Sequence, residues 1–363
     1  APFTIMAGTA LRIQNGYTFA NATTDIGLGS LELAGGTVNT AGVLRANDIT
    51  VSGPVISDGD LTLVTNTFIN SSGSATPFTI TGRWLIFSAD PLLNTLGGIT
   101  PDFKRYNCTE YFGGCFSGVN IPGTGNGLLY SIAPTLMITA DALSKMYGEL
   151  DPALTHTVSG LVDGDLANTP DVLAGAVGRA PGETVAGGPY AINQGALTSP
   201  MGYAINFTGN SFTITPRDIS VSVDPASKVY GAADVYTYTF GGSGLATGDT
   251  LGTAFTGAVN RAPGETVAGG PYAIDQGTLA ASSDYTLTLF TGSNLNITPA
   301  PLTVTASDFV KPYDGTSNTG GNGVIYSGFV LGDTSAVLGG ALSYGGTSQG
   351  AIDAGSYTIT PSG

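Results

Sequence analysis

The stretch Arg-Ala-Pro-Gly-Glu-Thr-Val-Ala-Gly-Gly-Pro-Tyr-Ala-Ile stands at residues 179–192 and returns unchanged at residues 261–274, an offset of 82 residues. Three shorter motifs recur with offsets of 83 or 84 residues. They are Lys-x-Tyr followed by Gly or Asp at 145, 228 and 311, Gly-Asp at 164, 248 and 332, and Ile-Thr-Pro at 214 and 297. Repetition at a fixed period of this length is the signature of tandem structural modules.

These repeats predict four regions. Residues 134–216 and 217–299 form two complete repeats, residues 300–363 form a third, and residues 1–133 differ in pattern. Tyr357 aligns with Tyr190 and Tyr272, yet only six residues follow it, so the third repeat lacks about one hairpin. We expect either a fragment of a longer protein or a last sheet that a strand of another molecule completes.

Composition and short-range pattern both indicate strands. Charged residues make up 10% of the chain, against about 25% in an ordinary soluble domain, and 55 residues are Gly. The hydrophobic content of 42%, with 16 Tyr and 15 Phe, distinguishes the chain from disordered Gly-rich sequences, which lack such residues. Alternating runs at 220–223 and 285–289 have the period of half-buried strands. We therefore expect an all-β protein.

Residues 1–133 contain shorter strands than the repeats. Apolar segments at 31–33, 49–51 and 61–63 are separated by turn-forming residues, with no helical period between them. Strands this brief are typical of the coils of a parallel β-helix. We expect the end of a right-handed parallel β-helix with capping loops, or alternatively a small sandwich, followed by tandem β-sandwich or β-grasp-like modules. The pattern is already under way at Ala1, which predicts a longer solenoid upstream.

The charge balance restricts the partners. With a formal net charge of −15, the surface would repel phosphate backbones and anionic lipid heads, so we expect no nucleic-acid partner.

No segment of the sequence approaches the roughly 20 consecutive apolar residues that a membrane span requires. No basic segment followed by an apolar stretch stands at Ala1, which predicts that a signal peptide was removed or lies upstream.

The two cysteines, Cys108 and Cys115, bracket a loop at 109–114. A short Gly-containing loop allows their side chains to reach bonding geometry, which predicts a disulfide, with two unpaired thiols as the alternative. Because disulfides persist in oxidising compartments, we expect a secreted protein, outside the cell or on its surface. A zinc site is not expected, since zinc usually takes four Cys or His ligands and His156 is the only histidine.

The sequence contains no recognisable catalytic apparatus. Acid–base catalysis at neutral pH relies on His or on carboxylates with separated pKa values. His156 stands in an alternating run at 154–158 and has no equivalent in the later repeats, which predicts a position on a strand surface. No Gly-Lys pair occurs anywhere in the chain, so a P-loop is absent. We expect that the protein is not an enzyme.

Two acidic turns are weak candidates for calcium, because hard cations take oxygen ligands from acidic loops. The candidate ligands are Asp58 with Asp60, and Asp163 with Asp165. Only Asp165 has counterparts in the later repeats, at Asp249 and Asp333, so a role in a turn or cap is favoured. No other cofactor is expected.

The Lys-x-Tyr motif admits several roles. It contains Tyr147, Tyr230 and Tyr313, each preceded by a lysine, Lys145, Lys228 and Lys311. We expect the tyrosines to occupy core or hinge positions and the lysines to protect a strand edge from pairing. Stacking of the tyrosines on sugar rings is one alternative. An isopeptide bond from the first two lysines to Glu183 and Glu265 is another.

Two sets of motifs resemble known bacterial families. The segments Gly82–Pro91, Phe103–Asn107 and Gly123–Tyr130 resemble the end of the passenger β-helix in filamentous-haemagglutinin-like exoproteins. The repeats resemble adhesin modules called MBG domains of the YGX type, at 147–148 and 230–231, and the YDG type, at 313–315. The resemblance covers nearly the whole chain. It implies two-partner secretion through an outer-membrane pore, a role in adhesion, biofilm matrix or fibre formation, and no catalytic residues.

These observations predict a secreted structural or adhesive protein that self-associates into an extended cell-surface or extracellular fibre. Head-to-tail assembly by strand complementation of the incomplete third repeat is the specific hypothesis. The alternative is a carbohydrate- or mucin-binding repeat module that acts by avidity, with a host or matrix glycan or protein as its partner.

Overall fold

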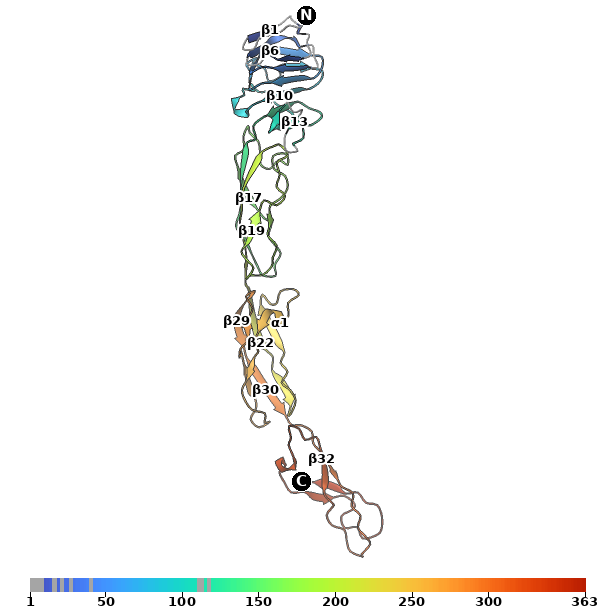
Figure 1. Cartoon of the computed structure of the whole chain (residues 1–363). Coiled ribbons are helices and arrows are strands. Elements are labelled where there is room, and N and C mark those ends of the chain that lie inside the picture. Colours follow the sequence, from blue (N-terminus) through green and yellow to red (C-terminus); the bar gives the residue numbers. More distant parts are fainter. Residues whose placement is uncertain are drawn as a thin grey trace. The chain divides into compact units, whose positions relative to one another are not determined.

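The computed structural model describes residues 10–14, 18–19, 23–25, 29–38, 42–109, 114–115 and 119–363 (Figure 1). The first residues, where we expected a solenoid already under way, lie outside them. Over the described residues the fold is nearly all-β. Helical elements include α1 (Leu251–Ala254) and the 3-10 turns η1 (Pro91–Leu93) and η3 (Ser335–Val337). The chain divides into two compact units, one with residues 1–145, 150–183 and 187–214, the other with 146–149, 184–186 and 215–363.

Two six-stranded sheets form the N-terminal part of the first unit (Figure 1). One contains β1 (Ala10–Gln14), β2 (Thr18–Phe19), β4 (Ser30–Val38), β6 (Asp48–Ser57), β8 (Thr67–Asn70) and β9 (Phe78–Ile80). The other contains β3 (Thr23–Asp25), β5 (Gly42–Arg45), β7 (Leu61–Val64), β10 (Trp84–Ser88), β11 (Phe103–Arg105) and β14 (Gly127–Tyr130). Every described pairing in them is parallel, so successive strands run the same way.

The core of these sheets is built from side chains stacked at matching positions of successive strands. The stacks are Leu31, Ile49 and Phe68 in one sheet, and Leu44, Leu63, Ile86 and Leu128 in the other. All seven side chains are at most 2% exposed. Because each strand is short, its apolar residues are buried mainly by the strands before and after it. The alternation of apolar and polar residues therefore extends over only a few residues at a time in the sequence.

The first two repeats share one topology. Repeat 1 has the sheets β17-β15-β20 and β16-β21-β19-β18, and repeat 2 has β24-β22-β29 and β23-β30-β27-β26 in the equivalent order, with β25-β28 added. The bounds in repeat 1 are β15 (Thr135–Ala140), β16 (Leu143–Met146), β17 (His156–Ser159), β18 (Gly178–Arg179), β19 (Tyr190–Asn193), β20 (Ala204–Thr208) and β21 (Asn210–Thr215). In repeat 2 they are β22 (Arg217–Val223), β23 (Ala226–Val229), β24 (Tyr238–Gly242), β25 (Phe255–Thr256), β26 (Asn260–Arg261), β27 (Tyr272–Asp275), β28 (Ala280–Ala281), β29 (Tyr285–Thr291) and β30 (Ser293–Thr298).

The last strand of each complete repeat, β21 or β30, is one of the two inner strands of its four-stranded sheet. In repeat 2, β30 runs parallel to β23 and antiparallel to β27, the strand that ends the 14-residue stretch. Its inward side chains, Leu295 and Ile297, are at most 5% exposed, as are Phe212 and Ile214 of the equivalent β21. This inner strand therefore supplies much of the core against which the repeated stretch is held.

The third repeat has smaller sheets. β31 (Thr303–Ala306) pairs with β32 (Val324–Ser327), and β33 (Ser343–Gly345) pairs with β34 (Thr360–Ser362). Residues 300–363 are all described, and none of the buried hydrophobic side chains falls among them. The third repeat thus lacks the apolar core of the first two.

Among the described residues, no helix has the length and apolar character needed to cross a membrane.

Candidate functional site

The repeated Gly-Asp motif forms a tight turn that fixes an aspartate. The backbone N–H of Asp165, Asp249 and Asp333 donates to the carbonyl three residues earlier, at 3.0 Å in each case. The glycines before them have positive φ angles, 71° at Gly164, 94° at Gly248 and 81° at Gly332. Since Gly adopts such angles without steric cost, the motif holds its carboxylate in one place at the end of the turn.

In the first unit this carboxylate accepts two tyrosine hydroxyls. The hydroxyls of Tyr106 and Tyr203 both donate to Oδ2 of Asp165 at 2.7 Å. Their rings meet edge to face, with centroids 4.7 Å apart. The ammonium group of Lys104 lies 2.5 Å from Oδ1 of Asp165. Tyr106 is fully buried and Asp165 is 9% exposed, so the contact is largely shielded from water.

The second unit contains the same arrangement one repeat later. Tyr285 donates to Oδ2 of Asp249, and the hydroxyl of Tyr147 also bonds to that carboxylate. The two rings again meet edge to face, with centroids 5.4 Å apart. Tyr147 belongs to the second unit together with its neighbours 146–149. The tyrosine that we expected in a core or hinge position therefore binds the Gly-Asp turn of repeat 2.

A third contact joins Tyr230 to Asp333, with the hydroxyl donating to Oδ2 at 2.9 Å. We call each of the three contacts a Tyr–Asp joint. Each consists of the aspartate of a Gly-Asp turn and the tyrosine hydroxyls bound to it. Tyr313, the third marker tyrosine, is 72% exposed, so it does not occupy a core position.

The residue that follows the joint tyrosine has a left-handed backbone in all three cases. The φ angle is 59° at Asn107, 79° at Gly148 and 86° at Gly231. At the two glycines there is also no room for a side chain. A Cβ on Gly148 would lie 2.5 Å from Cβ of Ala246, and one on Gly231 would lie 2.7 Å from Cβ of Val330. The Tyr-Gly motif is therefore required by both conformation and close approach.

The first joint was not predicted from the sequence. Lys104-Arg105-Tyr106-Asn107 is a further Lys-x-Tyr motif, but Asn replaces the Gly or Asp that follows the tyrosine in the repeats. Asn tolerates the left-handed region better than most residues, which is why it can stand at this position. A search for Lys-x-Tyr followed by any residue suited to positive φ would have found it.

Burial and the nearby aspartate raise the pKa of the joint tyrosines above the usual value for this side chain. Burial first, and then the bond to Asp165, raises the pKa of Tyr203 to about 12. Burial and Asp249 raise the pKa of Tyr285 to about 12 as well. The bond to Asp333 raises the pKa of Tyr230. Each hydroxyl therefore remains a hydrogen-bond donor to a carboxylate throughout the physiological pH range.

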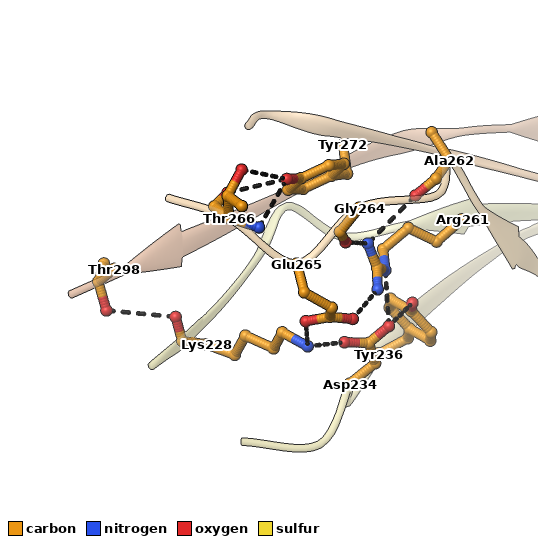
Figure 2. Close-up of polar contacts among 10 residues, drawn as sticks. All are labelled: Lys228, Asp234, Tyr236, Arg261, Ala262, Gly264, Glu265, Thr266, Tyr272 and Thr298. Carbon is orange, nitrogen blue, oxygen red and sulfur yellow. Dashed lines mark hydrogen bonds and ion pairs between the residues drawn. The ribbon is translucent and has the colours of Figure 1, made fainter. Parts of the chain in front are cut away.

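A four-residue ion-pair network includes the Arg and the Glu of the repeated 14-residue stretch (Figure 2). In repeat 2, Lys228 lies 2.6 Å from Asp234 and 2.7 Å from Glu265. Arg261 lies 2.7 Å from the same aspartate and also pairs with Glu265. Repeat 1 has the equivalent network of Lys145, Asp151, Arg179 and Glu183. The Arg and Glu of each network come from the repeated stretch, so the network ties that stretch to the strand carrying the lysine.

The rest of the stretch packs around the arginine (Figure 2). Arg261 stacks over the ring of Tyr272, with its guanidinium carbon 5.1 Å from the ring centroid. Tyr272 in turn donates to the carbonyl of Thr266 at 2.8 Å. A Cβ on Gly264 would overlap the Tyr272 ring, and the same holds for Gly182 and Tyr190 in repeat 1. These contacts account for the arginine, the first glycine and the tyrosine of the stretch in both repeats.

Lys145 and Lys228 lie on β16 and β23, which are edge strands of their sheets, and their ammonium groups are held in the ion-pair networks. Lys145 and Lys228 are each only 9% exposed, because their side chains point into the network. Hydrogen bonds to Asp234 and Glu265 raise the pKa of Lys228. A lysine held in its charged form is a poor nucleophile, so the contact with Glu265 favours an ion pair over the isopeptide bond.

The network predicts an acid-sensitive stability. Hydrogen bonds from Lys228, Arg261 and Tyr236, which outweigh partial burial, lower the pKa of Asp234 to about 2 from its usual 3.8. A carboxyl group with a depressed folded-state pKa stabilises the fold above its unfolded-state pKa, and this contribution disappears as the pH falls towards the folded-state value. We expect the melting temperature of repeat 2 to fall between pH 4 and pH 2.

Thermal denaturation measured across that pH range tests this. Asp234→Asn should lower the melting temperature at pH 7 and flatten its dependence below pH 4. The matched control is Asp218→Asn, which changes an exposed aspartate of β22. Equal slopes for Asp234→Asn and the unaltered chain would contradict the prediction.

Three of the four calcium candidates have protein partners. Lys104 lies 3.1 Å from Asp163 and bonds to Asp165, which also accepts the two joint tyrosines. Asp60 accepts the backbone N–H of Arg83 at 3.0 Å, and Asp58 is exposed. Over the described residues, no group of three His, Cys, Asp or Glu side chains could hold a metal ion.

The structure joins Cys108 and Cys115 in a disulfide between β12 (Cys108–Thr109) and β13 (Gly114–Cys115). Cys108 is 1% exposed and packs against Phe87 and Leu129. Residues 110–113 of the loop between the cysteines lie outside the described residues. His156 is half-buried in β17, opposite Ala140 of β15.

Comparison with known proteins identifies the two complete repeats. Residues 136–213 and 219–296 each match the family model described as MBG domain (YGX type). No curated protein and no solved structure matches the chain. The matched regions contain the four residues of each ion-pair network. They also contain the Tyr-Gly motif that gives the YGX type its description, and this motif is part of both Tyr–Asp joints of the second unit. The chain therefore carries two MBG domain repeats.

Proposed function

We propose that this chain is part of a secreted structural or adhesive repeat protein, without enzymatic activity, located outside the cell or on its surface. The observation that supports the proposal is the Tyr–Asp joint, which occurs three times, each time with a Gly-Asp turn and a tyrosine of the preceding region; the first two joints contain a second tyrosine as well. Each joint connects the tyrosine of one region to the Gly-Asp turn of the region that follows it in the sequence. Such a contact transmits load between successive modules, which suits a protein whose role is mechanical.

The joints also argue against the alternative of sugar binding by repeated tyrosines. A lectin site needs an aromatic face and a polar tip that are free to meet the sugar. Tyr147 and Tyr230 are half-buried, and their hydroxyls are bound to Asp249 and Asp333. Sugar binding at these positions would have to displace the joint contacts.

Two further features belong to the proposal. The parallel sheets of residues 10–130 suit the end of a right-handed parallel β-helix, as in filamentous-haemagglutinin-like proteins exported by two-partner secretion. The third repeat, with Tyr313-Asp314-Gly315, suits a YDG-type module. A disulfide between Cys108 and Cys115 is compatible with an oxidising, extracellular location.

Assembly into a fibre by strand complementation is part of the same proposal. In repeats 1 and 2, β15 and β22 each have a strand on both sides, whereas β31 has one described neighbour, β32. A sheet with an open edge presents unpaired N–H and C=O groups that can pair with an added strand. We propose that such an added strand connects successive molecules.

Single-molecule pulling tests the mechanical role. The chain is held at both ends and stretched, and a glycan array is probed with the same preparation. We expect separate unfolding events for the two MBG repeats, each releasing up to about 280 Å of chain, and a flat array profile. Unfolding below measurable force, together with saturable binding to one class of sugar, would favour the lectin instead.

A further inference from the structure

Two short segments of repeat 1 belong to the second unit, residues 146–149 and residues 184–186. We call them the first arm and the second arm. The first arm contains the Tyr-Gly motif that is bound in the Tyr–Asp joint of repeat 2. The second arm, Thr184-Val185-Ala186, lies in the repeated 14-residue stretch, directly after the glutamate of the ion-pair network. The same unit therefore holds two separate parts of repeat 1.

Asp284 of repeat 2 binds the second arm. The backbone N–H of Val185 donates to Oδ1 of Asp284 at 2.6 Å. Asp284 is half-buried and stands directly before Tyr285, whose hydroxyl is bound in the joint. Burial first, then Asp249, and in addition the charge of Asp284 raise the pKa of Tyr147. The carboxylate that binds the second arm thus also acts electrostatically on the tyrosine of the first arm.

Arg217 gives the first arm a further attachment. Its backbone N–H donates to the carbonyl of Asp284 at 2.9 Å. Its guanidinium donates to the carboxylate of Glu149 at 2.8 Å, and to the carbonyls of Ser243 and Gly244 at 2.6 Å and 3.0 Å. A guanidinium can make these bonds at once because it carries five donors in a fixed fork. Asp284 and Arg217 are therefore bonded to each other, and each binds one arm.

The two arms are also connected where they begin. Lys145 directly precedes the first arm, and Glu183 directly precedes the second. The side chains of these two residues form an ion pair in the network of repeat 1. The pair keeps the starting points of the arms together, so that once one arm is bound the other binds at a high effective concentration.

We infer that the two arms form a single clamp on repeat 2, in which Asp284 and Arg217 hold the arms and the Lys145–Glu183 pair keeps the arms together. The surface around Asp284 and Arg217 is then a recognition surface for the arms of the MBG repeat that precedes it. Glu183 acts as a positioning residue for this contact. The inference rests on the proposed function only for the mechanical purpose of the clamp.

Hydrogen exchange of the Val185 and Tyr147 amides in the full chain tests the clamp. In Asp284→Ala the Val185 amide should exchange at least about tenfold faster, because it loses a charged acceptor. The Tyr147 amide, which donates to the carbonyl of Thr215, should also exchange faster, because the arms bind together. Asp284→Asn should restore most of the protection, since its side-chain carbonyl can still accept.

A second variant breaks the connection between the arms without altering either arm. In Glu183→Gln both amides should exchange about threefold faster or more, because the ion pair at the start of the arms is lost. Lys145 keeps its contact with Asp151, so protection of β15 and β20 should not change. The matched control is Glu265→Gln, which removes the equivalent carboxylate from the identical stretch of repeat 2 and should leave both amides unaffected.

Two outcomes overturn the inference. Faster exchange of the Val185 amide alone in Asp284→Ala would show that the arms bind separately. Equal responses to Glu183→Gln and Glu265→Gln would show that the Lys145–Glu183 pair does not position the arms. Neither outcome concerns the bond between Tyr285 and Asp249, so the Tyr–Asp joint and the function proposed from it are tested separately by variants of Asp249.

Discussion

Replacing Asp249 by alanine is expected to destabilise the second unit by about 2–3 kcal/mol. The carboxylate accepts the hydroxyls of Tyr285 and Tyr147, and Tyr285 is 5% exposed. Removal of the acceptor leaves a buried hydroxyl donor without its charged partner, which costs more than the loss of a hydrogen bond at the surface. The same change should also release Tyr147 from its place beside the Tyr285 ring.

Hydrogen exchange followed by mass spectrometry is suited to this measurement, because a chain with several units does not unfold in one step. Protection of β22 and β29 should fall in Asp249→Ala, and protection of β10 and β14 in the first unit should not change. The control is Asp218→Ala, an exposed aspartate on β22 itself.

A double variant distinguishes a direct bond from a general loss of structure. Tyr285→Phe combined with Asp249→Ala should cost less than the sum of the two single changes by about 1 kcal/mol, because both partners of the bond are then absent. Strictly additive costs would show that Tyr285 and Asp249 contribute independently to the free energy of unfolding. The hydrogen bond between them would then not stabilise the joint.

The sequence alone predicted the features that depend on local pattern and on repetition. Alternating apolar residues predicted an all-β chain, and the structure is nearly all-β. The motifs around Tyr147 and Tyr230 predicted the MBG type that the family comparison identifies. These features could be predicted because strands and glycine turns are determined by patterns that extend over only a few neighbouring residues.

Features that depend on pairing between distant residues were only partly predictable: the pairing of Lys228 with Glu265 was raised as an isopeptide alternative, but the ion-pair network was not predicted. Lys228 was expected at a strand edge, and β23 is an edge strand. The position of its ammonium group between Asp234 and Glu265, which come from two different loops, was not predicted. Asp234 and Asp151 stand 83 residues apart, at the repeat offset, but a single aspartate in a loop carries no signal by itself. Only the register of the strands brings these side chains together.

The largest local effect is expected from a single methyl group at a joint. Gly148→Ala should cost the second unit about 2–5 kcal/mol, the sum of about 1–2 kcal/mol for a left-handed backbone and about 1–3 kcal/mol for overpacking. The φ angle at Gly148 is 79°, and the added Cβ would lie 2.5 Å from Cβ of Ala246. The contact between the Tyr147-Gly148 segment and the Gly-Asp turn of repeat 2 should open.

The chain offers a control that separates the two causes. Gly248 has a φ angle of 94°, but a Cβ there would meet no heavy atom within 4 Å. Gly248→Ala therefore reports the conformational cost alone. In addition, Ala246→Gly should partly rescue Gly148→Ala, because it removes the atom that the new methyl group meets. Exchange protection of the Tyr147 amide, which donates to the carbonyl of Thr215, measures the contact in each variant. Equal losses in Gly148→Ala and Gly248→Ala, without rescue, would mean that backbone conformation and not close packing determines the glycine of the Tyr-Gly motif.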